Sequence, residues 1–159
     1  MIADSLTLSA TYRFISRAKN VIGYSEFSAE AFIAFGSTPN TPDAPTMVTS
    51  TRTSITMAWT EPAPADGDLT TTGYILNMDD GYITELLPVY IGTNQIDVFE
   101  FTVGGLTNGL PYRFTVQAVN ENGLSEQSSI STYYSCAIPD NLSFPSYVSS
   151  DQVAKTITI

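Results

Sequence analysis

An internal repeat with a period of 100 residues constrains the fold of this chain more than any other feature. Residues 1–38 align with residues 101–138 without a gap. Identical pairs include Leu6 and Leu106, Tyr12 and Tyr112, Phe14 and Phe114, Asn20 and Asn120, Gly23 and Gly123, and Ser25 and Ser125. Weaker similarity continues beyond Pro39 and Pro139, so the chain ends inside a unit that has begun to repeat again. A fixed period of this length predicts consecutive small β-sandwich domains.

Short segments of alternating hydrophobic and polar residues indicate β-strands with one buried face. The residues predicted to face inward are Ile55, Met57, Trp59, Phe99, Phe101, Val103, Tyr112, Phe114, Val116 and Ala118. Segments rich in Pro, Asp, Asn and Gly lie between them, at 61–68, 79–81 and 120–123. These residues favour turns and are rare in central strands. The pattern predicts an all-β fold of antiparallel sandwiches.

The order and spacing of these residues resemble the fibronectin type III family. The strand that ends at Trp59, followed by Gly67 and then Tyr74, resembles the B strand, B–C loop and C strand of that family. Leu106, six residues before Tyr112, resembles the tyrosine corner, in which the phenol hydroxyl bonds to upstream backbone. The segment from Tyr112 to Ser125 resembles strand F, the F–G turn and the start of strand G.

The repeat and the resemblance together divide the chain into three parts. Residues 1–38 resemble the end of strand E with strands F and G, residues 39–139 a complete module, and residues 140–159 strands A and B of a following module. The expected core residues are Trp59, Tyr74, Leu106, Tyr112 and Phe114 in the complete unit, and Leu6, Tyr12 and Phe14 in the first unit. Two explanations of the partial units stay open: a window of a longer covalent array, or joining of the tail of one chain to the head of the next.

Composition excludes several classes of function. The formal net charge of −10 argues against nucleic acid and anionic lipid as partners. Both carry negative phosphates and bind proteins through basic surfaces. No apolar run is long enough to cross a bilayer, and residues 1–5 lack the features of a signal peptide, so either the chain is not secreted or its true beginning is absent.

The sequence has no His, and its single cysteine, Cys136, cannot form an internal disulfide. We interpret Cys136 as a small apolar side chain at a strand end, with an intermolecular bridge as the alternative.

We found little sign of catalytic or metal chemistry. Asp66, Asp68, Asp79 and Asp80 carry oxygen ligands of the kind that calcium prefers, but no EF-hand spacing is present and Asp is common in turns. Paired carboxylates also serve glycosidases, yet a single short sandwich offers little cleft for a sugar. The sequence therefore predicts a protein that is not an enzyme and has no metal or other cofactor.

Three surface features bear on possible partners. Tyr82, Tyr133 and Tyr134 could stack on a carbohydrate, although a place at a strand edge explains them as well. Asn141 begins the only Asn-x-Ser/Thr sequon and is a candidate for glycosylation. The F–G turn reads Asn120-Glu121-Asn122-Gly123, so the Arg-Gly-Asp integrin motif of some fibronectin type III members is not carried over.

The resemblance implies two functions from different classes. The first is a structural element of an extracellular or cell-surface rod, filament or fibril, whose partners are neighbouring copies or further modules of the same polypeptide. The second is an adhesion module that presents loops to a protein or glycan. The fold alone does not decide between them.

Overall fold

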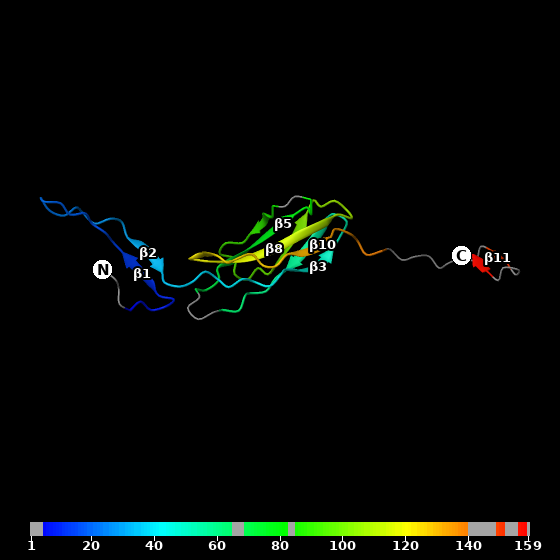
Figure 1. Cartoon of the computed structure of the whole chain (residues 1–159), viewed down its shortest axis with the longest axis horizontal. Helices are drawn as coiled ribbons and strands as arrows, with labels where there is room; N and C mark the ends of the chain where they lie inside the picture. Colours follow the sequence, from blue (N-terminus) through cyan, green and yellow to red (C-terminus); the bar gives the residue numbers. More distant parts are fainter. Residues whose placement is uncertain (1–4, 65–68, 83–84, 140–148, 152–155, 159) are drawn as a thin grey trace.

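The computed structural model describes residues 5–64, 69–82, 85–139, 149–151 and 156–158, and every regular element in them is a β-strand (Figure 1). The first unit contributes β1 (Thr11–Phe14) and β2 (Ala31–Ala34). The complete unit contributes β3 (Thr46–Ser50), β4 (Ser54–Ala58), β5 (Gly73–Asp79), β6 (Leu87–Ile91), β7 (Glu100–Gly104), β8 (Pro111–Asn120), β9 (Gly123–Leu124) and β10 (Ser131–Tyr134). The final two strands are β11 (Ser149–Asp151) and β12 (Thr156–Thr158).

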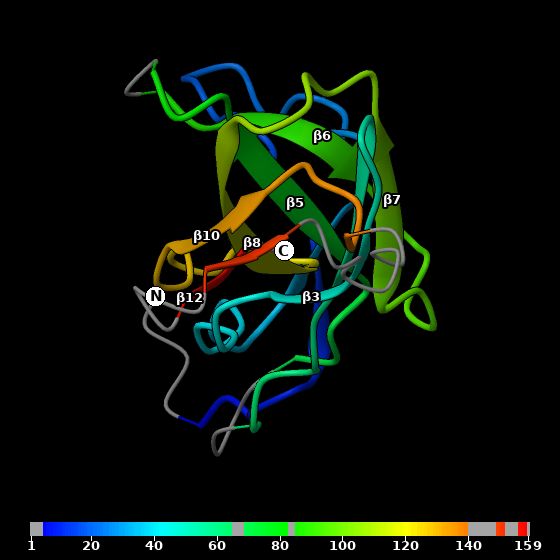
Figure 2. The same cartoon turned by 90° about the vertical axis from the view of Figure 1, so that its right-hand side faces the viewer.

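The strands of the complete unit form two antiparallel sheets that face each other. One sheet has the order β3–β4–β7, and the other has the order β10–β8–β5–β6 with β9 paired to β8. Figure 2 looks along the sandwich and shows β3 and β7 on one side and β5 and β8 on the other. The predicted antiparallel β-sandwich is therefore confirmed.

The register of the central strands explains why the alternating sequence forms this sandwich. Leu76 of β5 lies opposite Val116 of β8, and Met78 lies opposite Phe114. Since side chains alternate between faces along a strand, these residues share the face that is turned toward β4 and β7. Shifting either strand by one residue would turn its large apolar side chains to solvent.

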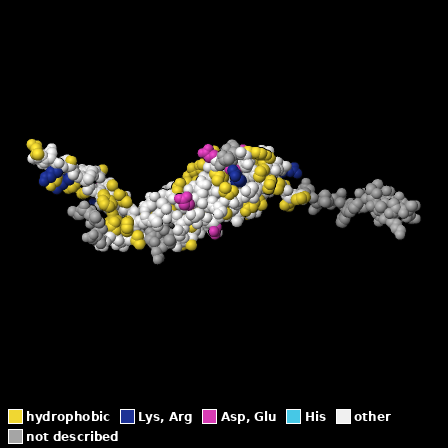
Figure 3. Space-filling view, viewed as in Figure 1, with side chains coloured by type: hydrophobic (Ala, Val, Ile, Leu, Met, Phe, Trp, Pro, Cys, Tyr) yellow, Lys and Arg dark blue, Asp and Glu magenta, His cyan; other side chains and the backbone are white. Residues whose placement is uncertain are grey.

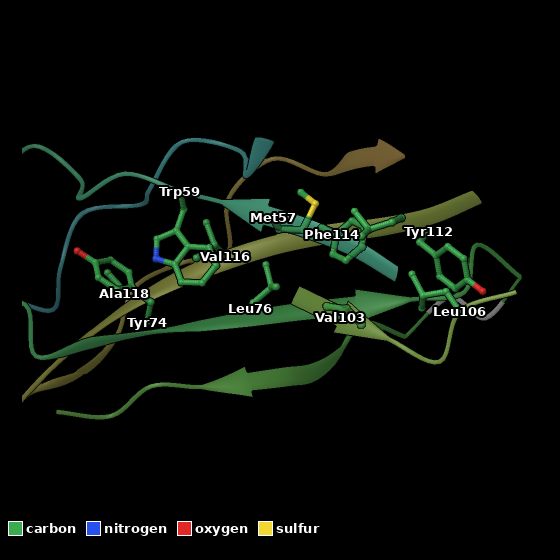
Figure 4. Close-up of a cluster of buried hydrophobic side chains, with 11 residues drawn as sticks. Met57, Trp59, Tyr74, Leu76, Val103, Leu106, Tyr112, Phe114, Val116 and Ala118 are labelled. Carbon is green, nitrogen blue, oxygen red and sulfur yellow. The ribbon is translucent and has the colours of Figure 1, made fainter. Parts of the chain in front are cut away.

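The hydrophobic core lies between the two sheets (Figure 4). The buried residues expected from the sequence are Trp59, Tyr74, Leu106, Tyr112 and Phe114, and each is at most 7% exposed. The ring of Trp59 lies 6.1 Å from that of Tyr74 and 5.7 Å from that of Tyr90, centroid to centroid. These tilted aromatic contacts fill one end of the core, and Tyr112 and Leu106 close the other.

The first unit corrects part of the sequence prediction. Leu6 and Phe14, expected in a core, are 38% and 49% exposed, and Tyr12 is only partly buried. The physical reason is that β1 pairs with β2 alone, and no second sheet in the described residues covers their apolar face. In the complete unit, the ring of Phe99 lies 5.4 Å from that of the buried Tyr74, as its inward position predicts, although Phe99 is 36% exposed.

Candidate functional site at the junction of two units

The connector between the first and complete units, residues 35–45, packs against the complete unit. Its three prolines, Pro39, Pro42 and Pro45, are all buried, with Pro45 fully so. Proline fixes the φ angle of its own residue and restricts the residue before it. A connector with three buried prolines has few backbone conformations, which favours a fixed path from β2 to β3.

Two asparagines of the F–G turn hold the start of this connector. The Nδ2 group of Asn120, at the end of β8, donates to the carbonyl of Ser37 at 2.8 Å, and Asn120 is almost completely buried. The Nδ2 group of Asn122 donates to the carbonyl of Gly36. The side-chain oxygen of Asn120 accepts from the backbone N–H of Asn122 at 2.9 Å, so one residue both shapes the turn and binds the connector. We call Asn120 and Asn122 the asparagine clasp.

Further contacts extend the junction to the B–C loop. The Nδ2 group of Asn40 donates to the carbonyl of Ala63 at 2.8 Å. A shallow hollow separates the ends of the two units, and its lining residues are Ser9, Thr11, Ala34, Leu69, Thr70, Thr72 and Glu121. The junction thus offers packing and neutral hydrogen bonds, which suit a mechanical contact between domains.

In the acidic turn after β5, Asp79 forms an ion pair with Arg113. Asp79 receives a forked hydrogen bond from Nε and Nη2 of Arg113, and its side chain is 1% exposed. The Arg113 guanidinium holds the pKa of Asp79 below its usual value of 3.8, against the effect of burial. Asp79 also accepts from the backbone N–H of Gly81, which supports the turn.

Of the other candidate calcium ligands, only Asp80 lies within the described residues. Asp80 accepts a hydrogen bond from the backbone N–H of Tyr82 at 3.1 Å, whereas Asp66 and Asp68 lie outside the described residues. In the described part of the chain, no group of three His, Cys, Asp or Glu side chains is placed to hold a metal ion. Within the same residues, no helix has the length and apolar character needed to span a membrane.

Tyr74 is a core tyrosine at the same end of the sandwich as the clasp. Burial raises the pKa of Tyr74 to about 12, and the nearby carboxylate of Glu61 adds to this effect. A hydroxyl that holds its proton so strongly is a poor proton donor or nucleophile at neutral pH. Tyr74 therefore acts as a packing residue.

The remaining candidates for a binding surface differ in their exposure. Tyr82 is 71% exposed in the loop after β5, and Tyr134 on β10 is also exposed, while Tyr133 packs partly against the core. Cys136 lies two residues after the end of β10, close to the predicted place at a strand end, and is exposed with a free thiol. Asn141 lies outside the described residues.

Sequence reasoning did not assign a function to the asparagine clasp. The repeat matches Asn20 with Asn120, and the sequence predicts residues 120–123 as a turn. Each does shape its own turn: Asn20 accepts from the backbone N–H groups of Ile22 and Gly23. Only the spatial position of the connector shows that the amide of Asn120 has a second partner, because 83 residues separate Asn120 from Ser37.

Comparisons with known proteins agree with this architecture. Residues 40–133 match the family model of the fibronectin type III domain. The chain is 34% identical over 141 residues to fibronectin type-III domain-containing protein 3a of Gallus gallus, which covers 85% of this chain and 11% of that protein. It is 31% identical over 140 residues to protein sidekick-1 of Homo sapiens, covering 84% of this chain and 6% of that protein.

Solved structures show the same fold. The FN1-FN3 domains of chicken CNTN1 superpose with a TM-score of 0.62 at 18% identity, covering 85% of this chain and 46% of that one. The chain spans about a tenth or less of the length of the two relatives above. It therefore corresponds to a small part of such proteins.

Proposed function

Because the chain belongs to the fibronectin type III domain family, we propose that it is a non-enzymatic building block of an extracellular or cell-surface rod, filament or fibril made of tandem units. The observation that carries this proposal is the junction. Three buried prolines and two clasp asparagines tie the connector to the complete unit, which limits rotation between neighbours. In a chain of units joined in this way, the orientation of each unit is fixed relative to the next.

The proposal assigns roles to the three parts of the sequence. Residues 39–139 form a complete module, residues 1–38 supply the late strands of a preceding module, and residues 140–159 supply the early strands of a following one. The exposure of Leu6 and Phe14 on the first unit supports this assignment, since their counterparts in the complete unit, Leu106 and Phe114, are buried. Partners would be neighbouring copies or further modules of the same polypeptide.

A distance measurement between the two units tests the junction. Spin labels at Ala29→Cys and Asn108→Cys, both exposed positions, are placed in a Cys136→Ser background. We expect one narrow distance distribution by pulsed electron spin resonance, broadened in the Asn120→Ala/Asn122→Ala variant. Asn20→Ala is the matched control, because Asn20 shapes the equivalent turn without holding the connector. A broad distribution in the unaltered chain would exclude a stiff junction.

Two measurements on the natural material test the assembly itself. Denaturing mass spectrometry separates a long covalent array from chains of 17.2 kDa that join without covalent bonds. Electron microscopy then distinguishes rods or filaments from compact particles. A glycan at Asn141 would support passage through the secretory route, and we expect peptide mapping to detect it if the protein is extracellular.

An adhesion module is the second candidate, and one observation favours it. The ring of Tyr82 is 71% exposed beside the acidic turn after β5 and packs into no core. An exposed aromatic ring on a loop suits contact with a protein or glycan. Under this alternative, Tyr82→Ala would abolish capture of the partner and leave the distance between units unchanged.

A further inference from the structure

The first unit carries four side chains that alternate cation and aromatic ring on the outer side of its hairpin. The guanidinium carbon of Arg17 lies 3.9 Å from the ring centroid of Tyr24 and 4.9 Å from that of Phe27. The Nζ atom of Lys19 lies 5.0 Å from the ring centroid of Tyr24. Cations at these distances are attracted by the electrons of the ring face. We call these four residues the cation–aromatic ladder.

The backbone beneath the ladder is well defined. The N–H of Ala18 donates to Oγ of Ser25 at 2.9 Å, and the N–H of Ser16 donates to Oγ of Ser28 at 3.0 Å. An isolated bridge joins Lys19 to Tyr24. These contacts fix the segment that carries the rings against the segment that carries the cations, so the ladder is held in place before any partner binds.

The repeat shows that the ladder faces away from the core of its own unit. The matching residues of the complete unit are Gln117, Val119, Leu124 and Gln127, and none of them is buried. The inward positions of the same strand, Phe114 and Val116, are fully buried. Strands that completed the first unit would therefore cover the side of Phe14 and leave the ladder open to solvent.

The ladder carries two positive charges, those of Arg17 and Lys19. Within the described residues, neither Arg17 nor Lys19 forms an ion pair, whereas Arg13 pairs with Glu30 and Arg113 with Asp79. Figure 3 shows Lys and Arg side chains gathered with hydrophobic ones at the far end of the first unit. An arginine stacked on a ring still presents its N–H groups edge-on, so it can bind a carboxylate while stacked.

The rest of the chain has the complementary charge. Residues 39–139 contain eleven Asp or Glu and two Arg, whereas residues 1–38 contain three of each sign. From this we infer that the ladder is a lateral docking surface for the acidic complete unit of a second copy of the chain. The inference deepens the proposed function, because it adds a side-to-side contact between copies to the end-to-end order of units.

Sedimentation equilibrium of the whole chain tests this surface. We expect self-association at low ionic strength that weakens as salt is added, since charges on the surface are screened. Arg17→Gln, which places the residue of position 117 in the ladder, should weaken association roughly two- to fivefold. Arg52→Gln is the matched control: Arg52 is exposed on the complete unit, and both variants give the same net charge. Tyr24→Leu keeps the charge and should weaken association as well.

Several results would overturn the inference. Equal effects of Arg17→Gln and Arg52→Gln would show a general effect of charge, and a monomer at every concentration would show that no such contact exists. Association that strengthens with salt would point to the apolar side of Phe14 instead. Binding of heparin in place of self-association would assign the ladder to an anionic polymer. The spin-label distance between the two units tests the junction independently. A failure of the lateral contact would therefore leave the proposed stiff junction unaffected.

Discussion

The two copies of the repeat share the hydrogen bonds of the tyrosine corner and of the turn serines, but their burial is very different. In the complete unit, the Tyr112 hydroxyl accepts from the N–H of Thr107 at 2.8 Å, and in the first unit the Tyr12 hydroxyl accepts from the N–H of Thr7 at 2.6 Å. The serine bonds beneath the F–G turn also recur, at Ser25 and Ser28 and again at Ser125 and Ser128. Yet Phe114 is fully buried, and Phe14 is half exposed.

This difference separates local from long-range determinants of the fold. The corner and turn bonds join residues close in sequence or on neighbouring strands, so they form wherever the local pattern is present. Burial requires a second sheet, which the first unit lacks in the described residues. We expect the hydrogen bonds to shape both copies and hydrophobic burial to stabilise only the complete one.

The largest expected effect comes from removing the matched phenylalanines. Phe114→Ala should lower the free energy of unfolding of the complete unit by about 3–5 kcal/mol, because it deletes a fully buried ring and leaves a cavity. Phe14→Ala should cost less than about 1 kcal/mol, since its ring is half exposed already. Denaturant unfolding followed by Trp59 fluorescence gives the first value, and circular dichroism of the whole chain, which also reports the strands of the first unit, gives the second. Equal losses would mean that the first unit has a core of its own.

The sequence predicts the fold of the complete unit well, for a definite physical reason. Period-2 alternation around Trp59 and Phe114 identifies the buried faces, because a strand with one covered face must place its apolar residues at alternate positions. Phe99 shows the limit of this rule. Its ring contacts the buried Tyr74 as the alternation predicts, but it lies just before β7 at the edge of the core and remains partly exposed.

The candidate site was harder to predict from the sequence. Asn120 carries the signature of a turn residue, and no local pattern reveals that its amide reaches the carbonyl of Ser37. The stacking of Arg17 on Tyr24 was missed as well, because the two residues lie on different segments of a hairpin whose register the sequence did not fix. Both contacts depend on how distant segments are placed relative to each other.

The next largest effect tests the tyrosine corner in the two copies. Tyr112→Phe removes the acceptor of the Thr107 N–H in a partly buried place and should cost about 1–2 kcal/mol. Tyr12→Phe should be close to neutral, because water can replace the hydroxyl at the exposed corner. Unfolding in urea measures the first value, and amide exchange of Thr7 and Thr107 reports the local change. A cost for Tyr12→Phe as large as that for Tyr112→Phe would contradict the comparison.

A smaller effect concerns the ion pairs of the two copies and their dependence on pH. Arg113 lowers the pKa of Asp79 in the folded state below the ordinary value of 3.8. The pair therefore stabilises the fold above that value, and the stabilisation is lost as the pH falls through the lower folded pKa. Asp79→Asn should lower the free energy of unfolding of the complete unit by about 1 kcal/mol at neutral pH. The variant should also lose less stability than the unaltered chain as the pH falls through the acidic range, which we call the acid limb of the stability curve.

The ion pair of Arg13, which is the repeat counterpart of Arg113, provides the control. Nη1 of Arg13 lies 2.9 Å from Oε1 of Glu30, but both side chains are largely exposed. Water and salt therefore screen their attraction. Glu30→Gln should change the stability by less than about 0.5 kcal/mol and leave the acid limb as it is. Thermal melts across the acidic range compare the two variants, and an unaltered acid limb in Asp79→Asn would remove Asp79 as its cause.

The smallest expected effect is that of calcium, which would act on the complete unit alone because its acidic turns have no counterpart in the first unit. Asp79 could bind a cation only by giving up its forked bond with Arg113, and the side chain of Asp80 already accepts from the N–H of Tyr82. We therefore expect the same melting temperature in EDTA and in millimolar calcium. A ligand that binds only the folded state must raise its stability, so a calcium-dependent rise of several degrees would show a metal site. Repeating the melt with Asp80→Asn would then show whether the turn after β5 holds the ion.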